Sequence, residues 1–264
     1  MRRGFMLNVW RGVFVCSVLT ASGCAMKPVD SFTLEVDLPA NFRFKSDAAY
    51  RPATGEICTL PKRRGKQPED KVFDTLGKPV ANRVSFEVPL TEVVDGCPLV
   101  LRSITFDMYA KWGERSADVG GDFAFVNVLD RLEEGRGGMP ESGVQELRGR
   151  CQWLFRTVGP LHAIRKILKC NSLDGGGRLL KARAGGVLQR DQLNGKNVRI
   201  VLELMREERP YMGDNWVRFP NGWKRCFGKS QEDQFAFCRG NTADFKPFKM
   251  PDGRECMIYP TCTE

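Results

Sequence analysis

The sequence predicts a mainly β protein, an antiparallel β-sandwich or barrel with a small disulfide-stapled C-terminal appendix. Apolar and polar residues alternate with a period of two along many segments, which is typical of strands that bury one face. No apolar stripe with the 3.6-residue period of a helix continues for more than two turns. Cysteines and aromatic residues gather after residue 210, where the regular alternation ends.

The predicted strands follow one another along most of the chain and are separated by turns rich in glycine and proline. Strict alternation marks residues 32–38, and residues 144–158 form the longest candidate strand. The dipeptide Asn194-Gly195 is the strongest short hairpin signal in the chain. Further candidate strands cover residues 42–44, 56–60, 72–73, 84–90, 99–110, 122–129 and 198–205.

Three other segments have weaker patterns. Residues 161–170 fit a strand or a short helix, and the proline and cysteine that bound them favour the strand. Residues 45–82 are rich in proline, glycine and charge, and they contain two of the short candidate strands. Because a long structureless loop is uncommon in a compact domain, we expect this segment to depend on a disulfide at Cys58. Frequent glycine predicts turns at residues 174–186.

Residues 210–264 are expected to form a cysteine- and aromatic-rich subdomain after a β domain at residues 32–209. A segment of this size has too little core of its own and relies on bridges. Its aromatic residues either replace the missing core or form an anchor patch for a partner, since large aromatics and arginine dominate interface hot spots. In the second case Trp216, Trp223 and Arg225 are the candidate partner contacts.

The first 23 residues have the organisation of a secretory signal peptide, with a positive start, a short apolar run and a small-residue step. The apolar run at residues 13–19 is shorter than the ~20 residues that a membrane-spanning helix needs. The sequence Ala-Ser-Gly-Cys at residues 21–24 resembles the lipobox of bacterial lipoproteins, although Ala21 stands where leucine is common. Ordinary cleavage next to Ala25, with free secretion, is the alternative.

The lipobox resemblance implies a lipid anchor. Cys24 would become the acylated N-terminus, followed by a tether at residues 24–31. Stable anchoring needs more than one acyl chain, which bacterial lipoproteins supply. Alanine, rather than aspartate, follows the cysteine at Ala25, and in this the chain resembles lipoproteins that are destined for the outer membrane. The resemblance therefore implies a protein that is anchored in the outer membrane of a Gram-negative bacterium and faces the periplasm.

The number of cysteines agrees with export. The chain has ten, of which Cys16 leaves with the signal and Cys24 is either acylated or lost. The remaining even number predicts disulfides in an oxidising compartment. If cysteines pair with near neighbours in the sequence, Cys58 pairs with Cys97 and Cys151 pairs with Cys170. The last four then pair among themselves: Cys226, Cys238, Cys256 and Cys262.

Composition indicates a globular chain with a mild positive charge. Of its 264 residues, 42% are hydrophobic and 28% are charged. The formal net charge is +9, and loss of the three signal arginines, Arg2, Arg3 and Arg11, lowers it to +6. This charge favours an acidic protein partner or an anionic surface. Nucleic-acid binding is not expected, because it needs a basic stripe with stacking aromatics.

The sequence predicts no catalytic centre, no cofactor and no metal site. His162 is the only histidine and no Cys-x-x-Cys motif occurs, which argues against zinc. The Gly-x-Ser-x-Gly pattern of serine hydrolases is absent. Carboxylate pairs such as Glu207-Glu208 are sequence neighbours, whereas a glycosidase needs two carboxyls that face each other across a cleft.

Export without catalytic motifs favours a protein-binding module. The layout of the chain is similar to that of the periplasmic immunity lipoproteins that protect against type VI lipase effectors, which implies a partner that is bound and neutralised. A structural or assembly lipoprotein of the envelope is the alternative. A carbohydrate-active enzyme with a facing carboxylate pair is a third hypothesis.

Overall fold

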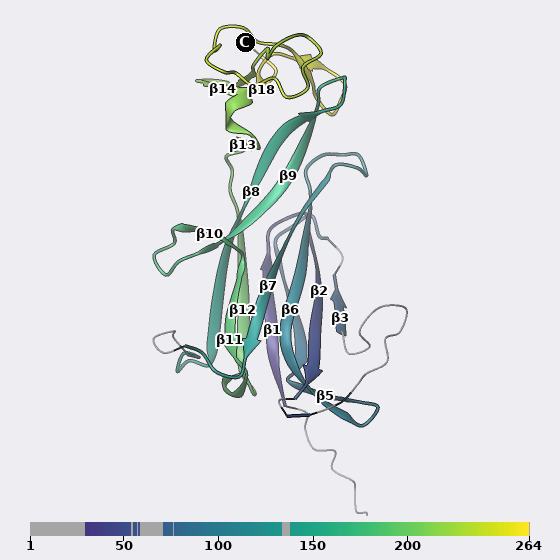
Figure 1. The fold of residues 1–264 in the computed structure, drawn as a ribbon, viewed down its shortest axis with the longest axis vertical. Helices are drawn as coiled ribbons and strands as arrows, with labels where there is room; N and C mark the ends of the chain where they lie inside the picture. Colours follow the sequence, from purple (N-terminus) through teal and green to yellow (C-terminus); the bar gives the residue numbers. More distant parts are fainter. Residues whose placement is uncertain are drawn as a thin grey trace, which may run out of the picture.

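β-Strands form almost all the regular structure of the chain, which confirms the predicted mainly β class (Figure 1). The structure is a computed structural model that describes residues 30–53, 55–56, 58, 71–75, 77–133 and 138–263. Within these ranges the helical elements are two 3₁₀ turns, η1 (Arg190–Gln192) and η2 (Gly213–Asn215). None of the described helices is long and apolar enough to cross a membrane.

Two large sheets contain most of the strands. The first contains β1 (Ser31–Leu38), β4 (Asn82–Pro89), β8 (Val144–Val158), β9 (Ala163–Leu173), β10 (Leu179–Arg183), β12 (Asn197–Leu204), β13 (Arg209–Pro210), β16 (Phe248–Lys249) and β17 (Glu255–Cys256). Its strand order is β17-β16-β9-β8-β12-β1-β4, with β10 beside β9 and β13 beside β8. The second contains β2 (Phe42–Pro52), β3 (Lys71–Asp74), β5 (Thr91–Val94), β6 (Cys97–Lys111), β7 (Val119–Leu129) and β11 (Gly185–Gln189). Its order is β11-β7-β6-β2-β3, with β5 beside β6.

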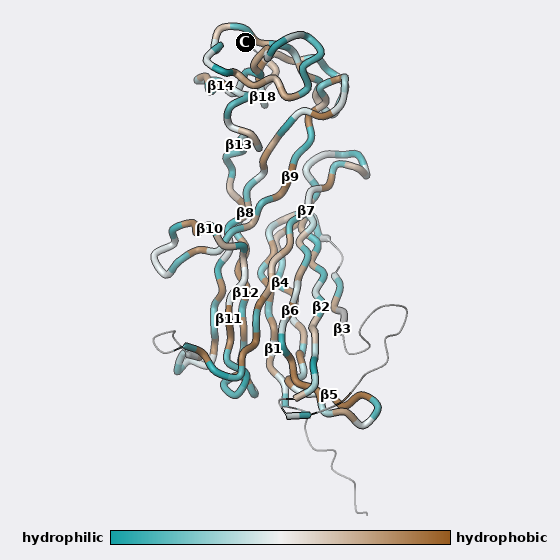
Figure 2. The backbone as a smooth tube through the Cα atoms, in the orientation of Figure 1, coloured by the Kyte–Doolittle hydropathy of each residue, from teal (hydrophilic) through white to brown (hydrophobic). Residues whose placement is uncertain are grey.

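The two large sheets pack face to face as a β-sandwich around one apolar core. Along β1 every second side chain is buried, from Phe32 to Leu38, and β2 continues the alternation from Phe42. Buried residues of both sheets belong to a single cluster, and both strand orders are open, so the sandwich is not a closed barrel. The alternating brown and teal of these strands in Figure 2 follows the same pattern.

Both sheets are mixed, which corrects the prediction that they are antiparallel. β12 lies between β1 and β8 and runs parallel to both, with Val198 beside Leu34 on one side and Gln145 on the other. β11 likewise runs parallel to β7. Parallel neighbours need long connections, so they join segments that are distant in sequence, and local alternation does not reveal them.

The segments with weak patterns are where the prediction and the structure differ. Residues 45–52 continue β2 instead of forming a loop, and residues 174–186 contain β10 and the start of β11. The turn at Asn194-Gly195 joins strands of different sheets, so it is not a hairpin. Residues 163–170 are in β9, which confirms the strand, while the candidate at 56–60 lies mostly outside the described residues.

One long hairpin joins the sandwich to the C-terminal segment (Figure 1). β8 and β9 pair antiparallel over most of their length and extend beyond the sandwich core. Along β8, Trp153 packs in the sandwich core, whereas Phe155 packs in a second core with the C-terminal segment. Cys151 and Cys170 lie opposite each other on the sandwich side of this border and form a disulfide. The hairpin therefore carries the predicted 210–264 subdomain away from the sandwich.

The C-terminal segment is held by the hairpin, a small sheet and two disulfides. Its three-stranded sheet contains β14 (Trp216–Phe219), β15 (Gly222–Arg225) and β18 (Tyr259–Pro260). The four disulfides of the described chain confirm the predicted pairing and settle the last four cysteines. They join Cys58 with Cys97, Cys151 with Cys170, Cys226 with Cys238 and Cys256 with Cys262.

Removal of the hairpin disulfide should destabilise the protein more than removal of the last one. The sequence separations are 19 residues for Cys151 with Cys170 and 6 for Cys256 with Cys262. Restriction of the unfolded chain predicts losses of about 3 and about 2 kcal/mol in the free energy of unfolding. Urea unfolding of the two double alanine variants, followed by tryptophan fluorescence, measures both values. A larger loss for the shorter loop would contradict this explanation.

Candidate protein-binding face

The outward face of the six-stranded sheet carries a row of exposed apolar side chains along β7. Val119, Phe123, Phe125 and Leu129 alternate with buried residues and are each 41–46% exposed. Tyr109, on the neighbouring β6, extends the row and is exposed to a similar degree. These five side chains form the β7 face.

Both sides of β7 are apolar, which is unusual for an outer strand of a sandwich. Ala124, Val126 and Val128 point into the core. A sheet with one solvated face normally has polar residues on its outward side. The two-sided apolar pattern of residues 122–129 is the sequence signal for the β7 face, and a prediction based on strand alternation alone does not use it.

Two glycines allow close approaches at the β7 face, Gly121 to the Tyr109 ring and Gly185 to the backbone of Phe125. Gly121 is paired with Tyr109, and a Cβ at Gly121 would lie only 3.1 Å from the Tyr109 ring. Gly185 of β11 is paired with Phe125, and a Cβ there would collide with the Phe125 carbonyl oxygen. The φ of Gly185, +141°, is also one that other residues rarely adopt.

Arg183 contacts Phe123, in the middle of the β7 face, through its guanidinium group. The Arg183 guanidinium lies 3.9 Å from the centroid of the Phe123 ring, a cation–π contact. Its Nη1 donates to the Asp122 carboxylate and, at 3.1 Å, to the Phe123 carbonyl oxygen. The other Asp122 oxygen accepts from the backbone N–H of Cys170 at 2.8 Å. Phe123 is therefore fixed by contacts that connect β7 to the disulfide-bridged hairpin.

Two grooves border the β7 face, one at the Val119 end and one beside its middle. Groove 1, beside Tyr109 and Val119, has a volume of about 410 Å³ and is also lined by Lys78 and Lys111. Groove 2, beside Phe125, has a volume of about 460 Å³ and lies against the β10–β11 segment. Both volumes are in the range of small-ligand and side-chain pockets.

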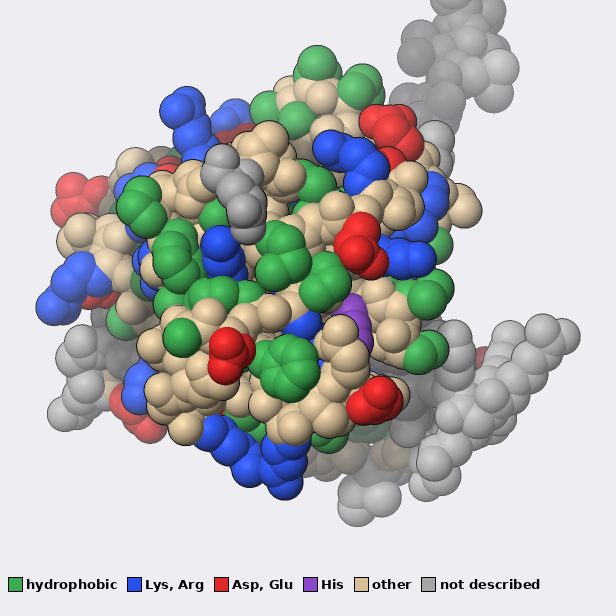
Figure 3. Space-filling view, turned by 90° about the horizontal axis from the view of Figure 1, so that it is seen from above, with side chains coloured by type: hydrophobic (Ala, Val, Ile, Leu, Met, Phe, Trp, Pro, Cys, Tyr) green, Lys and Arg blue, Asp and Glu red, His purple; other side chains and the backbone are tan. Residues whose placement is uncertain are grey.

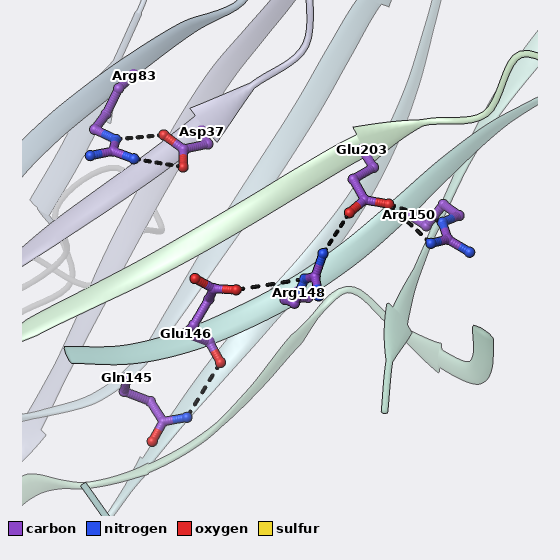
Figure 4. A network of polar contacts seen from close by, with 7 residues as sticks. All are labelled: Asp37, Arg83, Gln145, Glu146, Arg148, Arg150 and Glu203. Carbon is purple, nitrogen blue, oxygen red and sulfur yellow. Dashed lines mark hydrogen bonds and ion pairs between the residues drawn. The ribbon is translucent and has the colours of Figure 1, made fainter. Parts of the chain in front are cut away.

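The outward face of the nine-stranded sheet has the opposite character, because its charges are paired (Figure 4). Glu203 accepts from Arg148 at 2.8 Å and from Arg150 at 3.0 Å. Arg83 forms a bidentate pair with Asp37, at 2.6 and 2.9 Å. Such exposed ion pairs add little stability, but they provide the arginines and carboxylates of this face with partners. The exposed apolar residues of this sheet, Leu179, Leu180 and Leu204, are on β10 and at the end of β12, whereas the six-stranded sheet has a row of them along β7.

The C-terminal candidates are mostly interior residues, which favours the first of the two alternatives, a replacement core, over a contact patch at these positions. Trp216 is 4% exposed and Arg225 is 1% exposed. Trp216 packs edge-on against Phe155, at 4.9 Å between ring centroids, so it belongs to the core that the aromatic residues build. Only Trp223 is partly exposed, and the Arg218 guanidinium covers its ring at 4.9 Å.

Buried cations hold the C-terminal segment together by binding backbone carbonyl oxygens. Arg225 donates to Thr157 Oγ1 of the hairpin at 2.9 Å and to the Gln234 carbonyl at 2.9 Å. Lys246 Nζ donates to the Ser230 and Asp233 carbonyls at 3.1 and 2.7 Å. Burial lowers the pKa of Arg225 to about 10. These hydrogen bonds offset part of the cost of burying the two charges, a cost that also lowers the pKa of Lys246.

The surface of the C-terminal segment carries side chains of several kinds. Figure 3 views the C-terminal segment from above, with hydrophobic, basic and acidic side chains interspersed. His162, drawn in purple, lies in the turn of the β8–β9 hairpin. Burial, followed by the charges of Arg225 and Lys246, lowers its pKa.

Two further predictions concern the N-terminus and metals. The predicted lipidation site, Cys24, lies outside the described residues. Among the residues that are described, no group of three or more His, Cys, Asp or Glu side chains is placed to hold a metal ion.

The stability of the protein should fall as the pH is lowered from about 7 to about 5. Because the folded-state pKa of His162 lies below its ordinary value of 6.5, the unfolded chain binds the proton more readily. The contribution of neutral His162 is therefore fully present above the unfolded pKa and is lost progressively below it.

The variant His162→Asn tests this pH dependence, because asparagine tolerates the positive φ of 48° at this position. His162 is the only histidine, so the variant should flatten the curve of melting temperature against pH between about 5.5 and 7.5. The measurement is thermal unfolding across that range. An unchanged slope would show that another group causes the dependence.

The β7 face and its two grooves distinguish one surface of the described chain from the rest. Their apolar character contrasts with the paired charges of the opposite sheet and the mixed surface of the C-terminal segment. Comparison with protein-family models, with curated proteins and with solved structures finds no match for this chain.

Proposed function

We propose that this chain is an exported, lipid-anchored protein-binding module of the outer membrane that contacts its partner through the β7 face. The observation that carries the proposal is the exposed row of Phe123, Phe125 and Leu129 on a sheet whose inner side already packs in a core. Contiguous exposed apolar surface on a folded protein marks an interaction site. The row supports another protein as the ligand because it is extended along a strand.

The physical properties of the β7 face suit a protein interface. Full burial of a phenylalanine contributes on the order of 1.5–3 kcal/mol, and these rings, already half covered, would contribute a part of that. The cation–π contact of Phe123 with Arg183 restricts the Phe123 ring before binding. Less side-chain entropy is then lost on association.

The proposed anchor at Cys24 is consistent with an accessible β7 face. β1 begins at Ser31, at the end of the sandwich that lies away from the C-terminal segment (Figure 1). A lipid attached a few residues earlier would place the C-terminal segment farthest from the membrane. The β7 face, which runs along the side of the sandwich, would be open to a partner in the periplasm.

Neutralisation of a secreted effector is the narrower form of the proposal. Its support is the export signal, the layout of the chain and the absence of a catalytic motif from the sequence. Deletion of the gene distinguishes this role from that of an assembly lipoprotein. An immunity protein should be needed only when the effector is present, whereas loss of an assembly protein should weaken the envelope in pure culture.

Replacing two side chains of the β7 face should abolish recovery of the partner without unfolding the protein. The variant Phe125→Gln/Leu129→Gln removes exposed apolar groups, so its melting temperature should stay within a few degrees of the parent value. In affinity purification from envelope extract, we expect a stoichiometric partner with the parent chain and at least a tenfold reduction with the variant.

The matched control is Phe235→Gln in the C-terminal segment. Phe235 is 63% exposed, which is more than Phe125, so the control removes a comparable apolar surface elsewhere. It should leave the recovery unchanged. Recovery that depends on Phe235 and not on Phe125 would move the interface to the C-terminal segment, and absence of any stoichiometric partner would contradict the proposed function.

A further inference from the structure

We infer that groove 1 binds an acidic segment of the protein partner, with one apolar side chain inserted between flanking carboxylates. The inference rests on the proposed function and adds the chemistry of the partner segment. Two members of the β7 face, Tyr109 and Val119, line the groove, so it is continuous with the proposed interface.

The floor of groove 1 is apolar and large enough for a side chain. Pro79, Tyr109, Ala110 and Val119 contribute to its wall, and its volume is about 410 Å³. Ala110, a buried residue of β6 between the exposed Tyr109 and Lys111, also lines the groove. A small inorganic anion would leave this apolar surface uncovered, whereas an aromatic or aliphatic side chain would fill it.

The rim of groove 1 is positively charged. Arg43, Lys78 and Lys111 line it, and no carboxylate does. Arg43 is already paired with Asp74, at 3.1 Å from its Nε. Lys78 and Lys111 are exposed and have no ion pair with any residue in the described part of the chain. Two lysine charges therefore remain for carboxylates of a ligand.

The two lysines are held on either side of the groove by one turn residue. Asn41, between β1 and β2, donates its backbone N–H to the Lys78 carbonyl at 2.7 Å. Its own carbonyl accepts from the Lys111 N–H at 3.2 Å. Asn41 has a φ of 65°, which asparagine tolerates better than most residues. The spacing of the lysine backbones is thus part of the fold.

Groove 2 lacks this electrostatic property. Its cation, Arg183, is already bonded to Asp122 and stacked on Phe123. Selection of an acidic segment therefore belongs to groove 1. The mild positive charge of the whole chain, +9 before loss of the signal, acts in the same direction.

Synthetic peptides test the inference with the full mature chain. The first has one phenylalanine flanked by two glutamates on each side, the second replaces the glutamates with lysines, and the third replaces the phenylalanine with alanine. We expect the first to bind at least tenfold more tightly than either of the others. NMR titration, with the methyl groups of Ala110 and Val119 as reporters, measures affinity and location together.

Charge reversal at the rim should remove this preference. In Lys78→Glu/Lys111→Glu the first peptide should bind at least tenfold more weakly, and 0.5 M salt should weaken its binding to the parent chain. The matched control, Lys196→Glu, changes an exposed lysine beside the opposite end of β1 and should leave the affinity within twofold. Equal binding of the three peptides, or no loss in the double variant, would overturn the inference.

Affinity purification of the two double variants from envelope extract distinguishes failure of the groove 1 inference from failure of the proposed function. If Lys78→Glu/Lys111→Glu recovers the partner as well as the parent chain does, while Phe125→Gln/Leu129→Gln does not, groove 1 is not used and the β7 face still is. Loss of the partner in both variants, with normal melting temperatures, supports both conclusions.

Discussion

Oxidation of eight cysteines is the constraint on which this structure depends. The bridges occur where strands leave a packed layer. One joins Cys58 to the start of β6, and another joins Cys151 to Cys170 where the hairpin leaves the sandwich. The remaining two lie within the C-terminal segment, whose own core is a small group of mostly aromatic residues. A segment of that size cannot bury enough apolar surface to fold alone, so bridges compensate, and hydrogen bonds to backbone carbonyls offset the cost of burying Arg225 and Lys246.

The two outer faces of the sandwich distribute polarity differently, and this difference supports the β7 face as the proposed partner surface. On the nine-stranded sheet, Glu203 and its neighbouring arginines satisfy one another and leave little for a partner. On the six-stranded sheet, β7 is mainly apolar on both sides, and Arg183 lies over its outward Phe123 ring. Exposed rings of this kind have a cost in solubility, which is offset when a partner covers them. The charge selection that we propose for the lysines of groove 1 would act at one end of the same surface.

Alternation of apolar and polar residues was sufficient to predict strands that have one buried side and one exposed side. β1 and β8 fit that description, and the predicted residues 144–158 coincide with β8. It was insufficient for β10 and β11, where glycine suggested only turns, and for the parallel position of β12, which depends on distant segments. Residue type alone did not decide between core and contact surface for the C-terminal segment, and the burial of Trp216 and Arg225 decides for the interior at these two positions. Phe123 and Phe125 were recognisable only from an apolar pattern on both sides of one strand.

The central claim is that export precedes and permits the oxidised scaffold. Intact-mass measurement of the protein isolated from its native envelope tests it most directly. We predict a chain that begins at Cys24, carries acyl groups and has lost two hydrogens for each of its four disulfides. A chain that retains Met1, with all of these cysteines as free thiols, would contradict the claim.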